Sequence, residues 1–328
     1  MKLVLLSILL LLASLPAVVP QPSDPGMEAS RQEVRVGKLR PQQSVFGEEY
    51  PNAFPCLLEH IGRETAINLV PSPIQLESFL DERLRECPFV YANYAERKWD
   101  FSEEERSALR KYLENGGFLF IDGGITASFL RGRGRLGLHH SFAEWEATPE
   151  LKEAFADVLP GHQFTPLRRN DPLYTAFYRG LPDTSLLPDT VRDYTIREKW
   201  PDGTYSAVAI RLHGRIAVLC TPIIAMGWGR DTLGRWTNSI RFRILEGTDR
   251  LDEALKVASY GGERFEVTRE DGGKDVLYCQ EPGLPAWCHE PDGRWRVFRY
   301  YSSREISDFT HVFYTRLGTN ILVHALTQ

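Results

Sequence analysis

Two continuous apolar runs on either side of one short helix constrain the fold more than any other feature of this sequence. The runs are FVYANY (89–94) and FLFID (118–122). Between them, Ser102 and Glu105 have the spacing of a helix capping box, and Asn115-Gly116-Gly117 is a helix stop. Strand, helix and strand without polar alternation are typical of a right-handed crossover in a parallel sheet that is buried on both faces. The sequence therefore predicts an α/β fold with a mostly parallel sheet.

Hydrophobic spacing and turn residues predict the remaining elements. Helices are expected over 52–61, with Asn52 as cap, and over 75–85, 142–159 and 309–326; a short strand is expected over 67–70. A β-hairpin is expected over 206–220, around the turn His213-Gly214-Arg215. Residues 261–301 alternate short β-type runs with Asp-Gly and Pro-Gly turns, which predicts a small antiparallel β insertion near the C-terminus. We expect a lead-in linker over 21–51 and one α/β domain over 52–328.

The N-terminal residues have the order of a secretory signal. Lys2 gives a positive start, an apolar run follows over 3–15, and Pro16 ends any helix. A membrane span needs about 20 apolar residues. We therefore expect 1–20 to be a signal peptide and the protein to be periplasmic or extracellular, with no membrane span once the signal is removed. An uncleaved anchor over 3–19 is the alternative.

Composition narrows the possible partners. The chain is 42% hydrophobic and 25% charged, as folded globular proteins are. Its formal net charge of −5 provides neither the basic surface of a nucleic-acid binder nor a polybasic membrane patch. Envelope proteins, glycans and small molecules are the partners that remain.

The cysteines suggest one disulfide. There are five, an odd number in a compartment that permits disulfides: Cys56, Cys87, Cys220, Cys279 and Cys288. Cys279 and Cys288 are the candidate pair, because the residues between them contain Pro and Gly and can fold back as a loop. The alternative is that all five are small buried apolar side chains, which is the preferred interpretation for Cys220 in an apolar strand.

Several segments of this sequence resemble a known bacterial family. They are ECPFVYANYAERKWDFSEEERSALRKYLENGGFLFID (86–122), DPLYTAFY (171–178), the hairpin around HGRIAVL (213–219) and YTRLGTNILVHALTQ (314–328). The chain is similar to domain of unknown function 4159. The resemblance implies a layered sheet like that of flavodoxin and of class I glutamine amidotransferases, and a setting in the cell envelope; it implies no known activity. It also implies a structural role for Arg316 and Asn320, which lie four residues apart on one helix face and match the family pattern.

The sequence departs from that family at two turns. Gly123-Gly124-Ile125 stands where the family has a second acidic residue and a Cys- or His-containing turn, and Asp171-Pro172 replaces a His-Pro pair. An amidotransferase nucleophile sits on the sharp turn after a central strand, and the corresponding turn here, Asp122-Gly123-Gly124, holds neither Cys nor Ser. Cys220 is followed by Thr221-Pro222, and no motif places a His beside it. Amidotransferase activity is therefore not expected.

The same turn is the best candidate for a ligand site. Ligands of doubly wound sheets collect at the carboxyl ends of strands, where both apolar runs end. We expect one pocket there, lined by Asn93, Tyr94, Asp122, Gly123, Gly124 and Trp228. In the functional interpretation, Asp122 binds a polar ligand or a metal ion. In the alternative interpretation, Asp122 caps the next segment and the glycines only make a tight turn.

Three other groups of residues have structural explanations that we prefer. His139-His140 matches no metal-ligand spacing, so neither metal nor cofactor is expected. Arg131, Arg133 and Arg135 alternate with glycines and suit an anion or an acidic glycan, but also a solvated loop. The aromatic run 295–301 suits sugar stacking or cross-strand packing.

Two hypotheses for function follow. The first is a non-catalytic binding or scaffold module of the envelope that keeps a ligand-binding fold without its nucleophile. The second is a hydrolase acting on a carbohydrate or peptide-like substrate, with Asp122 as acid, base or metal ligand. A second carboxylate next to Asp122 would favour the enzyme, and the candidates are Glu96, Glu144 and Asp231.

Overall fold

The computed structural model describes residues 33–42, 50–129, 142–186, 207–229, 242–246, 263–268, 274–279, 286–289, 295–301 and 304–328. Side chains are described in these ranges except at 126–129, 142–145, 184, 242–301 and 304–307. Across the described ranges, no helix is both long and apolar enough to cross a membrane. The predicted signal peptide, His139-His140 and the Arg131 to Arg135 segment lie outside the described residues.

Seven strands form the main sheet, in the order β2-β1-β3-β4-β9-β8-β7. Their bounds are Gly37–Leu39 (β1), Ile74–Leu76 (β2), Phe89–Asn93 (β3), Phe118–Asp122 (β4), Thr165–Pro166 (β7), Val208–Leu212 (β8) and Arg215–Thr221 (β9). The strands from β2 to β9 in this order are parallel to their neighbours, and β8 and β7 are antiparallel. The predicted α/β class, parallel sheet and β8–β9 hairpin are confirmed.

The predicted crossover is β3, α2 (Glu103–Glu114) and β4. β3 and β4 pair in parallel from Phe89 opposite Phe118 to Asn93 opposite Asp122. At the start of α2 the Ser102 and Glu105 side chains each bond the other's backbone N–H, as a capping box requires. Both strands therefore end at the same edge of the sheet.

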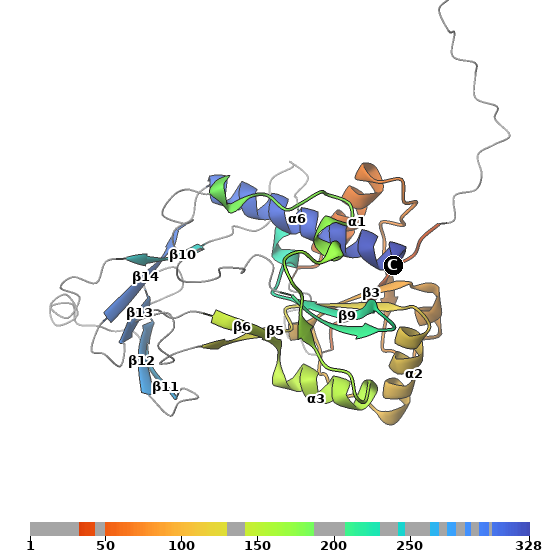
Figure 1. Ribbon diagram of the computed structural model, residues 1–328, viewed down its shortest axis with the longest axis horizontal. Helices are drawn as coiled ribbons and strands as arrows, with labels where there is room; N and C mark the ends of the chain where they lie inside the picture. Colours follow the sequence, from red (N-terminus) through yellow and green to blue (C-terminus); the bar gives the residue numbers. More distant parts are fainter. Residues whose placement is uncertain are drawn as a thin grey trace, which may run out of the picture. The chain divides into compact units, whose positions relative to one another are not determined.

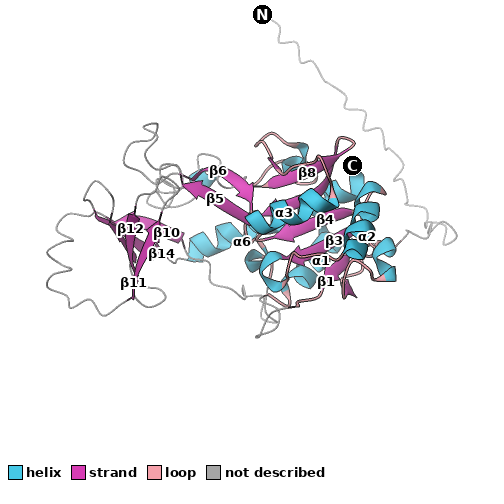
Figure 2. Ribbon diagram, turned by 90° about the horizontal axis from the view of Figure 1, so that it is seen from below, coloured by secondary structure: helices cyan, strands magenta, loops and turns pink. Residues whose placement is uncertain are grey.

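Helices cover both faces of this sheet, which explains the continuous apolar runs. α1 (Ala53–Glu64) and α6 (Arg304–Thr327) lie on one face, and α2 and α3 (Pro149–Val158) on the other (Figures 1 and 2). Alternate residues of the strands enter the two cores: Tyr91 and Phe120 pack with α1 and α6, while Val90 and Leu119 pack with α2 and α3. Burying each of these side chains contributes about 1.5–3 kcal/mol to the free energy of unfolding.

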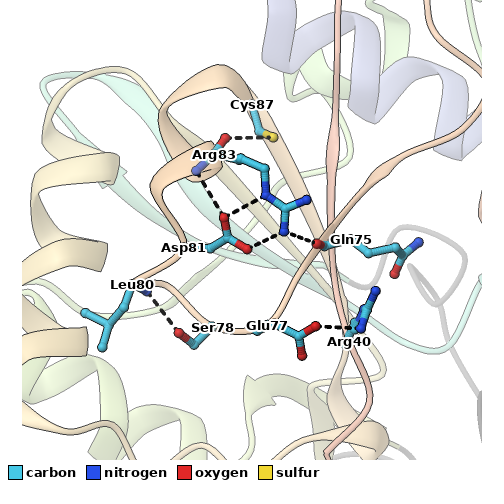
Figure 3. A network of polar contacts seen from close by, with 8 residues as sticks. All are labelled: Arg40, Gln75, Glu77, Ser78, Leu80, Asp81, Arg83 and Cys87. Carbon is cyan, nitrogen blue, oxygen red and sulfur yellow. Dashed lines mark hydrogen bonds and ion pairs between the residues drawn. The ribbon is translucent and has the colours of Figure 1, made fainter.

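The helix predicted over 75–85 is wrong. This segment contains the edge strand β2, an irregular turn and the short 3₁₀ helix η1 (Glu82–Glu86). The apolar residues at helical spacing are not one stripe, because Leu80 is 53% exposed whereas Leu76 and Phe79 are buried. A polar network holds the turn, with Asp81 accepting from the Arg83 backbone and side chain while Arg83 also donates to the Gln75 carbonyl oxygen (Figure 3).

Part of the helix predicted over 142–159 is also wrong. Residues Phe142–Ala147 form strand β6, which pairs antiparallel with β5 (Ile125–Phe129), and the helix begins only at Pro149. The Thr148 side chain accepts from the Leu151 N–H as the helix cap. Proline favours the first helical position and an extended residue before it, so Thr148-Pro149 was the boundary signal.

The lead-in prediction is wrong for Gly37–Leu39, because these residues are strand β1, which pairs with β2 and β3. A three-residue strand is too short to show a hydrophobic period. Gly37 is required by the packing there, since a Cβ atom would lie 2.7 Å from the Leu76 Cδ1 atom. The strand predicted over 67–70 is only one isolated bridge, between Leu69 and Val34.

A second sheet contains the β-rich part of the chain. Its order is β10-β14-β13-β12-β11, all antiparallel, with bounds Phe242–Glu246, Trp295–Tyr301, Ala286–His289, Lys274–Cys279 and Glu263–Thr268. Antiparallel strands were predicted over 261–301, whereas β10 precedes that range. Cys279 lies opposite Ala286, and Cys288 lies opposite Leu277. Their side chains are outside the described residues, so the disulfide stays a prediction.

Candidate functional site

Asp122 lies at the carboxyl end of β4 and is completely buried. Its Oδ1 atom accepts hydrogen bonds from the Ile224 N–H at 2.7 Å and the Thr221 hydroxyl at 3.4 Å. Its Oδ2 atom accepts from the Ala225 N–H at 3.0 Å and the Tyr91 hydroxyl at 3.2 Å. Burial raises the pKa of Asp122 to about 7, against the opposing effect of these hydrogen bonds.

The carboxylate therefore fixes the turn that follows β9. Ile224 and Ala225 open the short 3₁₀ helix η7 (Ala225–Gly227), whose first backbone N–H groups have no helical partner. Asp122 satisfies two of them across the sheet. This is the capping alternative in a modified form, because the capped segment follows β9 and not β4 itself. Since both carboxylate oxygens are occupied and buried, Asp122 has no free face toward a substrate.

The glycines beside Asp122 are required by packing. Gly123 has φ +93°, and a Cβ atom there would lie 2.8 Å from the Ile223 Cγ1 atom. A Cβ atom on Gly124 would lie 2.5 Å from the Leu151 Cδ1 atom of α3. Ile223 therefore occupies the space that we expected a ligand to take at the Gly123 backbone.

Asn93 and Trp228 are also held by internal contacts. The Asn93 carboxamide oxygen accepts from the Ala95 N–H and caps the short helix η2 (Tyr94–Glu96), while its amide lies 3.4 Å from the Glu96 carboxylate. The Trp228 indole N–H donates to the Tyr314 carbonyl oxygen at 3.0 Å, and its ring packs against the aromatic face of the sheet. Both side chains are buried.

Tyr94 differs from the other predicted pocket residues, because it lines an open cleft. Its hydroxyl donates to the Glu150 carboxylate of α3 at 3.0 Å, and its ring stacks on Trp99 with centroids 6.1 Å apart. The cleft has a volume of about 560 Å³. Its lining residues are Tyr94, Ala95, Arg97, Lys98, Trp99, Asp100, Phe101, Arg106, Glu150, Glu153, Ala154 and Asp157. The predicted pocket is therefore split into a buried part at Asp122 and an open part at Tyr94.

A second cleft, of about 710 Å³, lies where η1 leads into β3 and α2 ends. Leu80, Leu84, Cys87, Tyr112 and Gly117 are among its lining residues. Burial raises the pKa of the Cys87 thiol to about 11, so this thiol stays protonated at neutral pH. Cys220 is fully buried in β9, and burial raises its pKa well above the usual value. Neither thiol is an activated nucleophile.

The one candidate second carboxylate that the structure describes, Glu96, is not among the hydrogen-bond partners of Asp122. Glu96 is buried beside Asn93, while the Glu144 side chain and Asp231 lie outside the described residues. The described side chains contain no group of three or more His, Cys, Asp or Glu residues placed to hold a metal ion.

Asn320 joins α6 to the segment that carries DPLYTAFY. Its oxygen accepts from the Phe177 and Tyr178 N–H groups at 3.1 and 2.8 Å, and its amide donates to the Tyr174 carbonyl oxygen at 2.6 Å. The Arg316 guanidinium lies 5.2 Å from the centre of the Tyr178 ring. Both residues thus bind a connecting segment, and neither lines the cleft.

Sequence reasoning missed Tyr91 and Arg97. Tyr91 belongs to an apolar run, and its hydroxyl two residues before the strand end was the only sign of a polar partner. Arg97 follows the strand as one of several charged residues, and nothing in its spacing marks it as buried. The backbone donors to Asp122 belong to a distant segment, 102 and 103 residues along the chain.

Comparison with known proteins identifies the family of this chain. No curated protein matches the chain. The model of one family, described as Domain of unknown function (DUF4159), matches residues 35–257. The match includes β1, which the predicted domain over 52–328 left out, and it ends before Arg316 and Asn320. Because the matched residues make up more than half of the sequence, the chain belongs to the DUF4159 family.

Proposed function

We propose that this protein is a non-catalytic binding or scaffold module of the bacterial cell envelope, and that the cleft beside Tyr94 is its ligand site. The observation that carries the proposal is the buried, fully hydrogen-bonded position of Asp122, the candidate catalytic residue. It is buried, and both its oxygens are engaged by internal donors. A general acid or base needs hydrogen-bond reach to the substrate, and Asp122 lacks it.

We further propose that the fold is flavodoxin-like and similar to that of class I glutamine amidotransferases. The strand order β2-β1-β3-β4-β9 supports this, because it corresponds to the 2-1-3-4-5 order of flavodoxin-like sheets. Helices on both faces agree with it. Such sheets bind ligands where the strand order reverses, between the first and third strands. The cleft beside Tyr94 begins directly after β3, and residues of α2 and α3 complete its lining.

The alternative is a hydrolase for a carbohydrate or peptide-like substrate, with Asp122 as acid, base or metal ligand. A pKa of about 7 suits a general acid or base, and this observation favours the alternative. The buried geometry opposes it. An enzyme would need the β9–η7 turn to move away from Asp122.

The test compares binding and hydrolysis in three forms of the purified protein. The wild type is titrated with envelope glycans and divalent ions and incubated with saccharide and peptide-like substrates. Ala95→Trp fills the cleft from an exposed position, and Asp122→Asn removes the carboxylate charge. We expect glycan binding in the wild type and in Asp122→Asn, loss of binding in Ala95→Trp, and no hydrolysis. Hydrolysis by the wild type that disappears in Asp122→Asn would establish the enzyme instead.

A further inference from the structure

Arg97 is a buried cation that has no carboxylate partner among the residues the structure describes. It directly follows η2, the short helix after β3, and only 6% of the residue is exposed to solvent. One guanidinium nitrogen, Nη1, donates to the Arg40 carbonyl oxygen at 2.7 Å. The Nε atom is buried and has no hydrogen-bond partner among the described residues. None of the ion pairs in the described part of the chain includes Arg97.

The two acidic side chains that act on the pKa of Arg97 are engaged elsewhere. Glu77 and Glu105 favour the charged form of Arg97, but burial is the larger effect and lowers the pKa of Arg97. Glu77 pairs with Arg40, and Glu105 completes the capping box of α2. A buried guanidinium is normally compensated by a bidentate anion, because taking the charge out of water is costly. The structure therefore contains a preformed half of an anion site.

The position of Arg97 is the one at which this type of sheet binds ligands. Its side chain connects the end of η2, which follows β3, with Arg40, the residue after β1, and so spans the point where the strand order reverses. It also lines the open cleft, whose volume of about 560 Å³ suits a small ligand.

We propose that this cleft binds an acidic saccharide, and that Arg97 receives its anionic group. The proposal rests on the proposed function and names the class of ligand. Tyr94 offers an aromatic ring for a sugar ring to pack against. The carboxylates of Asp100, Glu150 and Glu153 line the same cleft and accept hydrogen bonds from sugar hydroxyls.

The charges of the cleft limit the number of anionic groups on the ligand. Its cations are Arg97, Lys98 and Arg106, and its acids are Asp100, Glu150, Glu153 and Asp157. Arg106 is already paired with Asp157 at 3.3 Å. A polyanion would be repelled by the remaining acids, so the ligand carries one acidic group on an otherwise hydroxyl-rich body.

The test titrates the full chain with three short saccharides of equal length: one with a uronic acid, one with a single sulfate or phosphate ester, and one neutral. Binding of the first identifies a carboxylate as the recognised group, and binding of the second identifies an ester. We expect the neutral saccharide to bind at least about tenfold more weakly, because hydrogen bonds to charged groups contribute that much.

Arg97→Gln removes the buried charge, and Lys98→Gln removes one positive charge from an exposed position in the same cleft. We expect Arg97→Gln to lose about tenfold or more in affinity for the acidic saccharide, with little change for the neutral one. Lys98→Gln should change both by less than about threefold, since exposed ion pairs contribute little. Thermal melting separates lost binding from lost folding. Arg97→Gln is expected to keep the wild-type stability, because it removes an uncompensated buried charge.

The outcomes separate this inference from the proposed function. Equal binding of neutral and acidic saccharides, abolished by Ala95→Trp, would overturn the role of Arg97 and leave the binding module intact. Equal losses of affinity for the acidic saccharide in Arg97→Gln and Lys98→Gln would overturn it as well, because they would show that the ligand responds to the total charge of the cleft and not to Arg97 itself. If the wild type binds none of the three saccharides, or if Ala95→Trp binds them as well as the wild type, both proposals fail.

Discussion

The hydroxyl of Tyr91 on β3 donates to the Oδ2 atom of Asp122 on β4, across two neighbouring parallel strands. The oxygen atoms lie 3.2 Å apart, and both side chains are buried. The bond joins an aromatic residue of the core under α1 and α6 to the carboxylate that fixes the β9–η7 turn. Changes at either residue should therefore alter the stability of the fold and its dependence on pH.

Stability should fall as the pH rises from about 4 to about 7. Burial raises the folded-state pKa of Asp122 from the ordinary 3.8 to about 7, so the folded chain holds this proton more tightly than the unfolded chain. The contribution of Asp122 to the free energy of unfolding is fully present below about pH 4 and is expected to decrease by roughly 4 kcal/mol at most up to pH 7. Urea denaturation across this range measures it. In Asp122→Asn the decrease should disappear.

Asp122→Asn should itself destabilise the protein at pH 5, by about 1–3 kcal/mol. The side-chain NH2 group of asparagine would replace one carboxylate oxygen, and it can donate but not accept. One of the N–H groups of Ile224 and Ala225 therefore loses its acceptor while it stays buried. Chemical denaturation with matched m-values gives the difference. A variant as stable as the wild type would show that the turn after β9 does not depend on this carboxylate.

Tyr91→Phe should shift the titration of Asp122 to higher pH. The substitution keeps the ring that stacks on Phe54 with centroids 4.7 Å apart, but removes one donor to the carboxylate. The loss of stability should be about 1 kcal/mol above pH 7 and smaller near pH 5, where the carboxyl is protonated. The midpoint of the pH-dependent stability curve is the measurement. A midpoint that stays at the wild-type value would contradict the hydrogen bond.

Gly123→Ala should cost more stability than Gly161→Ala. Both glycines have positive φ, +93° and +83°, so both substitutions add backbone strain. Only Gly123 also meets a close neighbour, because its Cβ atom would lie 2.8 Å from Ile223, whereas nothing lies within 4 Å at Gly161. We expect about 1 kcal/mol for Gly161→Ala and at least about 2 kcal/mol for Gly123→Ala. Similar losses would indicate that strain alone requires Gly123.

Asn320→Ala should destabilise the protein by about 2–4 kcal/mol, since it leaves one buried and two partly buried backbone groups of the 174–178 segment without their partner. Arg316→Ala, one helical turn earlier, removes only a cation–π contact and should cost about 0.5–1 kcal/mol. Thermal melts of the two variants compare the loss of stability in Asn320→Ala with that in Arg316→Ala. Comparable effects would mean that Asn320 does not anchor this segment.

Export remains a prediction that N-terminal sequencing can test. Expression of the full sequence in a bacterial host is expected to give soluble protein outside the cytoplasm, beginning near residues 17–21. Recovery of intact Met1 in the membrane pellet would favour the uncleaved anchor.

Much of the fold could be predicted from the sequence, because strands that are buried on both faces of a sheet are continuous apolar runs. The runs around Tyr91 and Phe120 had to be central parallel strands, and the capped helix between them fixed the connection. β1 and β2 were missed because three residues show no period, and the residues that follow β2 have apolar spacing that also fits a helix. The position of Asp122 at the carboxyl edge was predictable. Its role was not, because its partners at Ile224 and Ala225 come from a distant segment.

The position of α6 in the chain has a consequence for how the protein reaches this fold. Every strand of the main sheet precedes α6 in the chain. Yet α6 packs on the core that contains the aromatic side chains of Phe54, Tyr91 and Trp228. A chain that emerges N-terminus first therefore exposes this face until α6 arrives to cover it. This core is therefore expected to form late in folding. Until then the incomplete chain exposes apolar side chains that a chaperone or a dye for apolar surfaces can bind.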